Sequence, residues 1–252
     1  MFDELGLPTQ KKYAVAYIDV LGVKQKIKTE SEWGLFSLWT LVGPLLNDWK
    51  SHERIKIKVF SDNILICEEI DENNPQIAIT DIFSVMKTIE FSQFNMGGAL
   101  FIRGAIVVGK LHFSDVFVYG QALLKAYSLE NEVAIFPRII VDRSVFEIVD
   151  KKENHITLDK DGIYFYDFMQ ARIDDGGKRL RQNIGMLKAN VLLNITNNVS
   201  QSSVISKMEW LVNYFNESCV NNNLHCNITP AEIYKSGLKV DSIHIVAKSC
   251  DK

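Results

Sequence analysis

The stretch "YAVAYIDV" from Tyr13 to Val20 is typical of a strand buried on both faces, because apolar, aromatic and β-branched residues follow one another without a polar face. One residue breaks this pattern, since Asp19 places a carboxylate near the end of the run. An isolated charge in so apolar a strand is costly unless it is paired or binds a metal. Asp19 is therefore the first functional signal in the chain.

A second carboxylate lies in "KIKVFSDNILIC" from Lys56 to Cys67. Two short strands, Ile55–Phe60 and Ile64–Glu68, flank turn-forming residues, which predicts a β-hairpin with Asp62 at an exposed tip. Asp62 is then either an ordinary turn residue or, together with Asp19, half of a metal site.

The bulk composition excludes several classes of protein. With 47% hydrophobic and 23% charged residues among 252, the chain is typical of a globular protein. Its net charge of −3 lacks the basic excess that a nucleic acid partner requires. No apolar run is long enough for a membrane span and no secretory signal is evident, so we expect a cytoplasmic protein without membrane contact.

Strands and helices alternate along the first two thirds of the chain. The spacing of apolar residues predicts helices at Glu32–Lys50, Gln76–Asn95, Tyr119–Glu132 and Val145–Val149, a strand pair within Ala99–Phe113, and a strand after Pro137. Gly104 and Gly109 mark either close backbone approach or a bend in that strand pair. This order predicts an α+β fold, a ferredoxin-like antiparallel sheet with helices packed on it.

The C-terminal part changes character at a polar, glycine-bearing junction. We expect a first domain over residues 1–170 and a helical extension over residues 171–252 packed on the same domain. Helical patterns around Leu187–Asn197 and Val204–Asn216, and a last strand near Val240–Val246, support this division.

Four motifs in order give the sequence a family resemblance. "YIDVLGV" (Tyr17–Val23), "KIKVFSD" (Lys56–Asp62), "RGAIVVG" (Arg103–Gly109) and "GQALLKAYSLE" (Gly120–Glu130) together resemble the catalytic domain of the class III nucleotidyl cyclases. The likeness covers about the first 140 residues. It implies that residues 1–170 form a cyclase-like catalytic domain that works as a homodimer.

The resemblance also implies roles for individual residues. Asp19 and Asp62, with the backbone carbonyl of Ile18, would hold two Mg²⁺ or Mn²⁺ ions, which prefer hard oxygen ligands. Arg103 would act at the catalytic site by clamping the triphosphate with two hydrogen bonds, and its alternative is a structural ion pair with an acidic neighbour.

The substrate-binding residues implied by the resemblance are Lys58, Phe117, Tyr119 and Lys125. Lys58 matches a base-contacting lysine, although a solvated lysine on a half-exposed hairpin explains it equally well. Lys125 stands near the position of a missing family residue, and a surface lysine is its alternative.

Departures from the family pattern bear on the substrate. Leu124 and Ser128 occupy the positions of an asparagine and an arginine in purine cyclases, and Phe117 occupies that of an adenine-reading aspartate. The sequence is most similar to the bacterial pyrimidine cyclases of anti-phage Pycsar systems. The resemblance implies conversion of UTP or CTP to the 3′,5′-cyclic monophosphate, which acts on a separate effector protein. The alternative is a non-catalytic, cyclase-like module that binds a nucleotide or a protein.

Overall fold

The structure is a computed structural model that describes residues 6, 8–23, 32–49, 52–95, 100–176, 180–197 and 201–237. Its contacts divide the chain into two compact units. The first comprises residues 1–89 and 100–167, and the second comprises residues 90–99 and 168–252. The predicted domain boundary between residues 170 and 171 stays a prediction.

The first unit is built around the opening strand, β1 (Lys11–Val20), whose residues from Tyr13 onward are buried. It pairs antiparallel with β3 (Asn63–Glu69) on one side and β4 (Ile102–Phe113) on the other, and β2 (Ile55–Phe60) pairs with β3. Helix α2 (Glu32–Trp49) follows β1, and helix α3 (Pro75–Asn95) follows β3.

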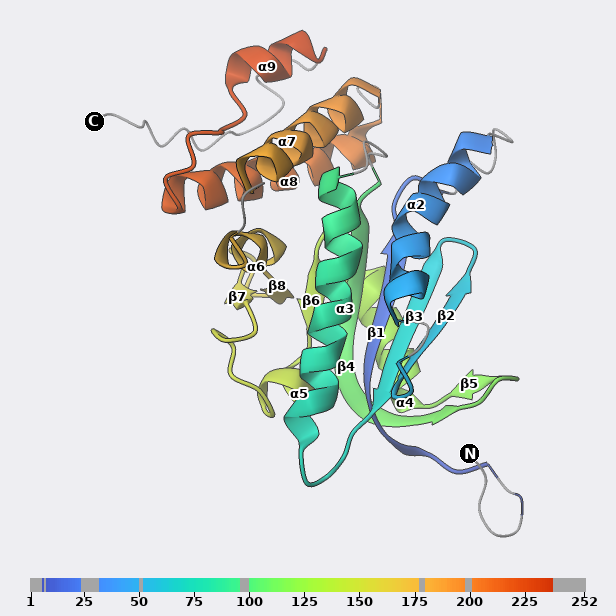
Figure 1. The fold of residues 1–252 in the computed structure, drawn as a ribbon. Coiled ribbons are helices and arrows are strands. Elements are labelled where there is room, and N and C mark those ends of the chain that lie inside the picture. The colour runs from blue at the N-terminus through green and yellow to red at the C-terminus, as the bar shows by residue number, and fades with distance from the viewer. Residues whose placement is uncertain are drawn as a thin grey trace. The chain divides into compact units, whose positions relative to one another are not determined.

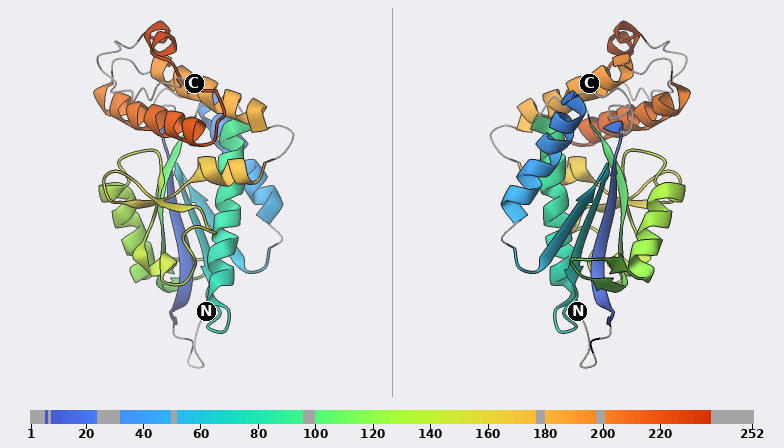
Figure 2. Two further views of the ribbon diagram at one scale, coloured as in Figure 1. Left: turned by 90° about the vertical axis from the view of Figure 1, so that its left-hand side faces the viewer. Right: turned by 90° about the vertical axis from the view of Figure 1, so that its right-hand side faces the viewer.

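The resulting strand order, β2-β3-β1-β4, is the ferredoxin-like arrangement. Figure 2 shows α2 and α3 on one face of these strands and α4 (Gln121–Ser128) on the other. The predicted α+β fold is confirmed, as are the hairpin of β2 and β3 and the two long helices.

The predicted strand after Pro137 is confirmed as β6 (Ile139–Val141), which pairs with β4. It is followed in the sheet by β8 (Tyr164–Tyr166) and β7 (Ile156–Leu158) (Figure 1). The prediction of a wholly antiparallel sheet is wrong at this edge, because β6 runs parallel to β4. Parallel neighbours need a long crossover connection. Here α4 and the π-helical turn η1 (Leu129–Val133) lie within that connection.

The predicted strand pair within Ala99–Phe113 is also wrong, since β4 is one continuous strand of 12 residues. β5 (Val118–Tyr119) folds back on its end, with His112 opposite Tyr119. Gly104 does not bend the strand but allows close approach. A Cβ atom there would overlap the carbonyl oxygen of Tyr17 and lie 3.1 Å from the Cα of Ile18.

Residues on both faces of β1 belong to the hydrophobic core. On the α4 face, one buried cluster joins Val15 and Tyr17 of β1 to Val107 of β4 and to Ala122 and Ala126 of α4. The two alanines are small, so the helix backbone lies close to the sheet. Beyond β6, Asp142 accepts a hydrogen bond from the Ser144 amide and begins the short helix α5 (Arg143–Phe146), close to the predicted one.

The second unit is helical in its described residues. It contains α6 (Phe168–Asp174), α7 (Leu180–Asn197), α8 (Ser202–Asn221) and α9 (Pro230–Lys235), together with residues 90–95 at the end of α3. The predicted helices around residues 187–197 and 204–216 are confirmed inside α7 and α8, and the predicted strand at 240–246 lies outside the described residues. Among the helices described here, none has the length and apolar character to span a membrane.

A buried carboxyl group lies between β3 and α3. Glu68 of β3 is 1% exposed. Arg54 pairs with two carboxylates here: its Nε lies 3.4 Å from Oε1 of Glu68, and its Nη2 lies 2.6 Å from Oδ2 of Asp81 in α3. Burial raises the pKa of Glu68 to about 7, the negative charge of Asp81 adds to this, and Arg54 opposes it. Glu68 therefore keeps its proton at pH values where an exposed glutamate is ionised.

We predict that Gly104→Ala lowers the free energy of unfolding by about 3 kcal/mol or more, because the added Cβ meets backbone rather than a movable side chain. Gly109→Ala in the same strand is the matched control. Its nearest neighbour is the Ala122 methyl at 3.3 Å, so a loss under about 1 kcal/mol is expected. Urea unfolding measures both, and equal losses in the two variants would contradict this account of Gly104.

We predict that stability falls as pH rises from about 4.5 to about 7, because the unfolded chain releases the Glu68 proton in this window while the folded chain retains it. Glu68→Gln removes this dependence. Thermal unfolding at pH 5 and pH 8 should show the Tm of the parent chain falling by roughly 5–10 °C more than that of the variant. Glu69→Gln, at an exposed position paired with Lys11, should leave the slope unchanged. Parallel curves for the parent chain and Glu68→Gln would contradict the burial argument.

Candidate active site

The carboxylate of Asp19 is buried at the end of β1 and paired with a cation. Arg103 lies directly opposite on β4, and its Nε donates to Asp19 Oδ2 at 3.0 Å. The same guanidinium forms an ion pair with Glu130 of η1, with Nη2 2.7 Å from Oε1. The structural ion pair considered for Arg103 from the sequence is thus present.

The tip of the β2–β3 hairpin differs from the prediction. Asp62 was expected to be exposed, but its exposed fraction is 3%. The amide of Val20 donates to the Asp62 carbonyl oxygen at 2.8 Å, so the hairpin tip is held against the end of β1. Ser61 adopts a φ of 57°, which tightens the turn. A turn signal in the sequence does not reveal such a long-range contact.

The backbone brings the two aspartates to neighbouring positions, since Asn63, the residue after Asp62, lies opposite Asp19, and both carboxylates act on the Tyr17 hydroxyl group. The pKa of Tyr17 is raised to about 12, first by burial and then by the negative charge of Glu130, with Tyr127, Asp19 and Asp62 adding to the effect. Tyr17 is two residues before Asp19 and therefore lies on the same face of β1. Asp19 of β1 and Glu130 of η1 thus share Arg103, and the hairpin turn with Asp62 lies beside the end of β1.

No group of three or more His, Cys, Asp or Glu side chains suited to a metal ion occurs among the described residues. A metal site here would therefore combine two carboxylates with other oxygen donors. Ile18, expected to supply a carbonyl oxygen, lies in the middle of the sheet opposite Ile64 and Gly104.

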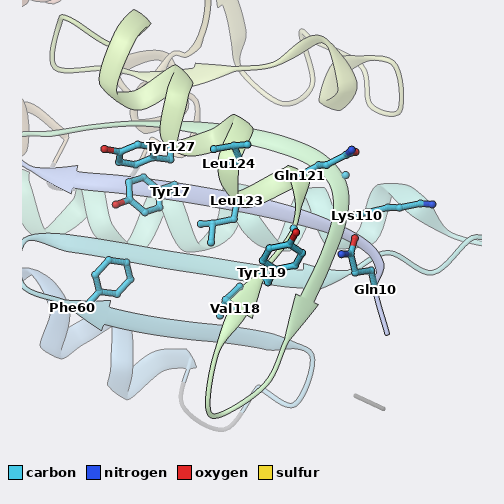
Figure 3. A pocket seen from close by; sticks show the side chains of 12 residues that line it. Gln10, Tyr17, Phe60, Lys110, Val118, Tyr119, Gln121, Leu123, Leu124 and Tyr127 are labelled. Carbon is cyan, nitrogen blue, oxygen red and sulfur yellow. The ribbon is translucent and has the colours of Figure 1, made fainter. Parts of the chain in front are cut away.

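An open aromatic cavity of about 1040 Å³ adjoins this cluster. Figure 3 shows Tyr17 and Tyr127 side by side and Phe60 on the neighbouring hairpin. Tyr17 meets Tyr127 edge to face with 5.8 Å between ring centroids, and Phe60 at 6.3 Å. The further lining residues are Gln10, Gly109, Lys110, Val118, Tyr119, Gly120, Gln121, Leu123 and Leu124.

A second cavity, of about 800 Å³, brings together Lys58 and Phe117. Lys58 Nζ donates to the carbonyl oxygens of Ser114 at 2.7 Å and Asp115 at 3.0 Å, which ties β2 to the turn between β4 and β5. Phe117 stacks on His112 with 4.7 Å between ring centroids. The substrate-binding residues that the resemblance implies are therefore divided between two cavities. Lys58 and Phe117 line this one, and Tyr119 lines the aromatic cavity.

Lys125 faces a different neighbour. Its Nζ lies 2.8 Å from Asp142 Oδ1, and Asp142 also begins α5. Lys125 lines neither of the two cavities described above. Leu124, by contrast, lines the aromatic cavity and is 65% exposed.

Three residues of the site were not identified as functional from the sequence. Glu130 belongs to a quoted motif, but its inward direction depends on the π-helical turn. Tyr17 could have been found from its two-residue spacing to Asp19. Phe60 ends a strand next to the turn, and its exposed ring reveals its role only once the cavity is known.

The sequence matches no protein-family model and no curated protein. Several solved structures are similar in part. The adenylyl cyclase CyaB from P. aeruginosa is 18% identical over 62% of this chain and 94% of that chain, with a TM-score of 0.46. The guanylyl cyclase Cya2 is 15% identical over 63% and 92%, with a TM-score of 0.43. The guanylate cyclase domain of RhGC from Catenaria anguillulae, solved with GTP, is 13% identical over 62% and 95%, with a TM-score of 0.42. At these values the likeness does not place the chain in a family.

We predict that Lys58→Met increases amide hydrogen exchange at Ser114 and Phe117, because the ammonium group holds the backbone of this turn. A loss of about 0.5–1.5 kcal/mol in stability should accompany the change. Lys110→Met, on β4 before this turn begins, is the matched control. Unchanged exchange at residues 114–117 in Lys58→Met would show that the lysine does not order the turn.

Proposed function

We propose that this chain is a nucleotidyl cyclase that converts a pyrimidine nucleoside triphosphate to its 3′,5′-cyclic monophosphate and pyrophosphate. The observation that carries the proposal is the burial of Asp19 and Asp62 next to each other along the backbone, where Val20 donates to the Asp62 carbonyl oxygen, beside an open aromatic cavity that Tyr17 lines. Two carboxylates from neighbouring strands beside a cavity of nucleotide size are what cyclisation of a triphosphate requires.

The donor set fits a hard divalent cation. Asp19 and Glu130 both pair with Arg103, and the hairpin turn that carries Asp62 lies beside the end of β1, so carboxylate oxygens are the donors that this site offers to a cation. Carboxylate oxygens are preferred by Mg²⁺ and Mn²⁺. Asp19 and Asp62 would hold the two ions, with Ile18 as an additional backbone donor. When bound, such ions neutralise phosphate oxygens and favour loss of the ribose 3′-hydroxyl proton.

The residues of the chain itself would bind and orient the substrate. Tyr17, Phe60 and Tyr127 offer ring faces and edges against which a base or ribose can pack. Lys58 and Phe117 of the second cavity, Tyr119 of the first, and Lys125 complete the proposed substrate contacts. Lys125 would have to leave Asp142 to take part.

The proposal of a pyrimidine rests on the residues that depart from the purine pattern. Phe117 cannot accept a hydrogen bond from an adenine amino group, and Leu124 and Ser128 cannot replace an asparagine and an arginine. We propose UTP or CTP as the substrate. The cyclic product would act on a separate effector protein in anti-phage defence.

A homodimer is part of the proposal. Tyr119 and Leu124 in the wall of the aromatic cavity are 66% and 65% exposed, and Phe60 and Tyr127 are also exposed. Apolar and aromatic surface of this kind favours coverage by a second copy, which would exclude water from the reacting phosphate.

The proposal is tested by incubating the purified chain with each of the four nucleoside triphosphates and Mn²⁺, then detecting cyclic product and pyrophosphate by chromatography and mass spectrometry. We predict cyclic UMP or cyclic CMP. Asp19→Asn and Asp62→Asn should each lower turnover at least about 100-fold, because a charged oxygen ligand is lost. Asp71→Asn, on an exposed loop, is the control for carboxylate loss.

Folding of each variant is verified by thermal unfolding before its turnover is interpreted. Absence of cyclic product from every triphosphate would contradict the proposal. Tight nucleotide binding without turnover would then favour a non-catalytic, cyclase-like module.

A further inference from the structure

The guanidinium of Arg103 is engaged through all three of its nitrogens. Nε donates to Asp19 Oδ2 at 3.0 Å, Nη1 donates to the carbonyl oxygen of Ala134 at 3.3 Å, and Nη2 lies 2.7 Å from Glu130 Oε1. The contact with Glu130 is an ion pair that is close but not aligned as a hydrogen bond. A planar group held at three corners cannot rotate freely.

Glu130 reaches Arg103 because the helix changes its pitch. After α4 the chain forms the π-helical turn Leu129–Val133, in which the Ala134 amide donates to the Leu129 carbonyl oxygen at 2.8 Å. Glu130 is buried there, whereas its neighbours Asn131 and Glu132 are exposed. Short π-helical segments occur frequently at functional sites. The turn thus places the Glu130 carboxylate next to Arg103, near the start of the central strand β4.

Stability alone is a weak reason for this arrangement. A buried carboxylate–guanidinium–carboxylate group loses hydration on folding, and such groups often add little to stability. The group does fix geometry. Asp19 accepts the hydrogen bond from Arg103 through Oδ2, and this hydrogen bond does not involve its other oxygen, Oδ1. A carboxylate held in this way presents one oxygen in a defined direction.

We infer that Glu130 is a positioning residue, which holds Arg103 so that Arg103 in turn orients Asp19 toward a divalent cation. This inference rests on the proposed function, since it concerns the same site. It also revises the expected role of Arg103. A clamp on the triphosphate would have to leave Asp19 and Glu130, two buried carboxylates, without their shared partner.

Metal binding without nucleotide tests the inference separately from turnover. Mn²⁺ is titrated into the full chain and the free ion is followed by electron paramagnetic resonance. Glu130→Gln keeps the shape of the side chain and removes its charge. We predict that it weakens Mn²⁺ binding about 10–100-fold, as loss of an outer partner of a metal ligand typically does. Glu132→Gln, exposed and two residues away, should bind Mn²⁺ like the parent chain.

Turnover provides a second readout that general damage to the fold would not reproduce. In Glu130→Gln, the Mn²⁺ concentration for half-maximal cyclisation should rise by the same factor, and saturating Mn²⁺ should restore most of kcat. The KM for the nucleotide at saturating Mn²⁺ should change less than about threefold, because Glu130 lines neither of the two cavities and so does not contact the nucleotide in this proposal.

The outcomes separate this inference from the proposed function. A parent chain that cyclises a nucleotide, with Glu130→Gln equal to it in Mn²⁺ affinity and Mn²⁺ dependence, would overturn the inference and leave the proposed function intact. A parent chain that neither binds Mn²⁺ nor forms cyclic product would overturn both. If Glu130→Gln fails to fold, the double variant Arg103→Gln/Glu130→Gln removes one buried positive and one buried negative charge together and keeps Asp19. Parent-like Mn²⁺ affinity in that variant would overturn the inference, and weakened affinity would support it.

Discussion

The burial of one negative charge at the end of β1 is the constraint on which the site depends. Asp19 interrupts a strand that is otherwise apolar, and the fold compensates its charge with Arg103 from the neighbouring strand. The pairing requires β1 and β4 to be in a register that sets the two residues directly opposite each other. Gly104, the residue after Arg103, allows these strands to approach closely. The charge and the strand pairing are therefore specified together.

The ferredoxin-like core explains why Asp19 lies on one particular face of the sheet. The long helices α2 and α3 cover one side of the central strands, and the short helix α4 covers part of the other (Figure 2). Asp19 shares the α4 side with Tyr17, where the aromatic cavity opens. A site on this face combines a rigid sheet, which fixes the carboxylates, with a surface that leaves room for a ligand.

The parts of the structure that depend on local pattern could be predicted from the sequence. β1, the β2–β3 hairpin and the helices α2 and α3 follow from runs of apolar residues with strand or helix spacing, and Asp19 stands out because its charge contradicts its surroundings. The burial of Asp62, the parallel pairing of β6 and the inward direction of Glu130 depend on contacts between distant segments. No spacing within a single segment reveals such contacts.

The central claim is that Asp19 and Asp62 hold divalent cations beside the aromatic cavity. Its most direct measurement is a crystal structure of the chain with Mn²⁺ and a non-cyclisable analogue of UTP, with data collected at the Mn absorption edge. The account predicts anomalous peaks at about 2.1–2.3 Å from carboxylate oxygens of both aspartates and in contact with the triphosphate. Manganese bound elsewhere, or the two carboxylates turned away from each other with no ion between them, would contradict it.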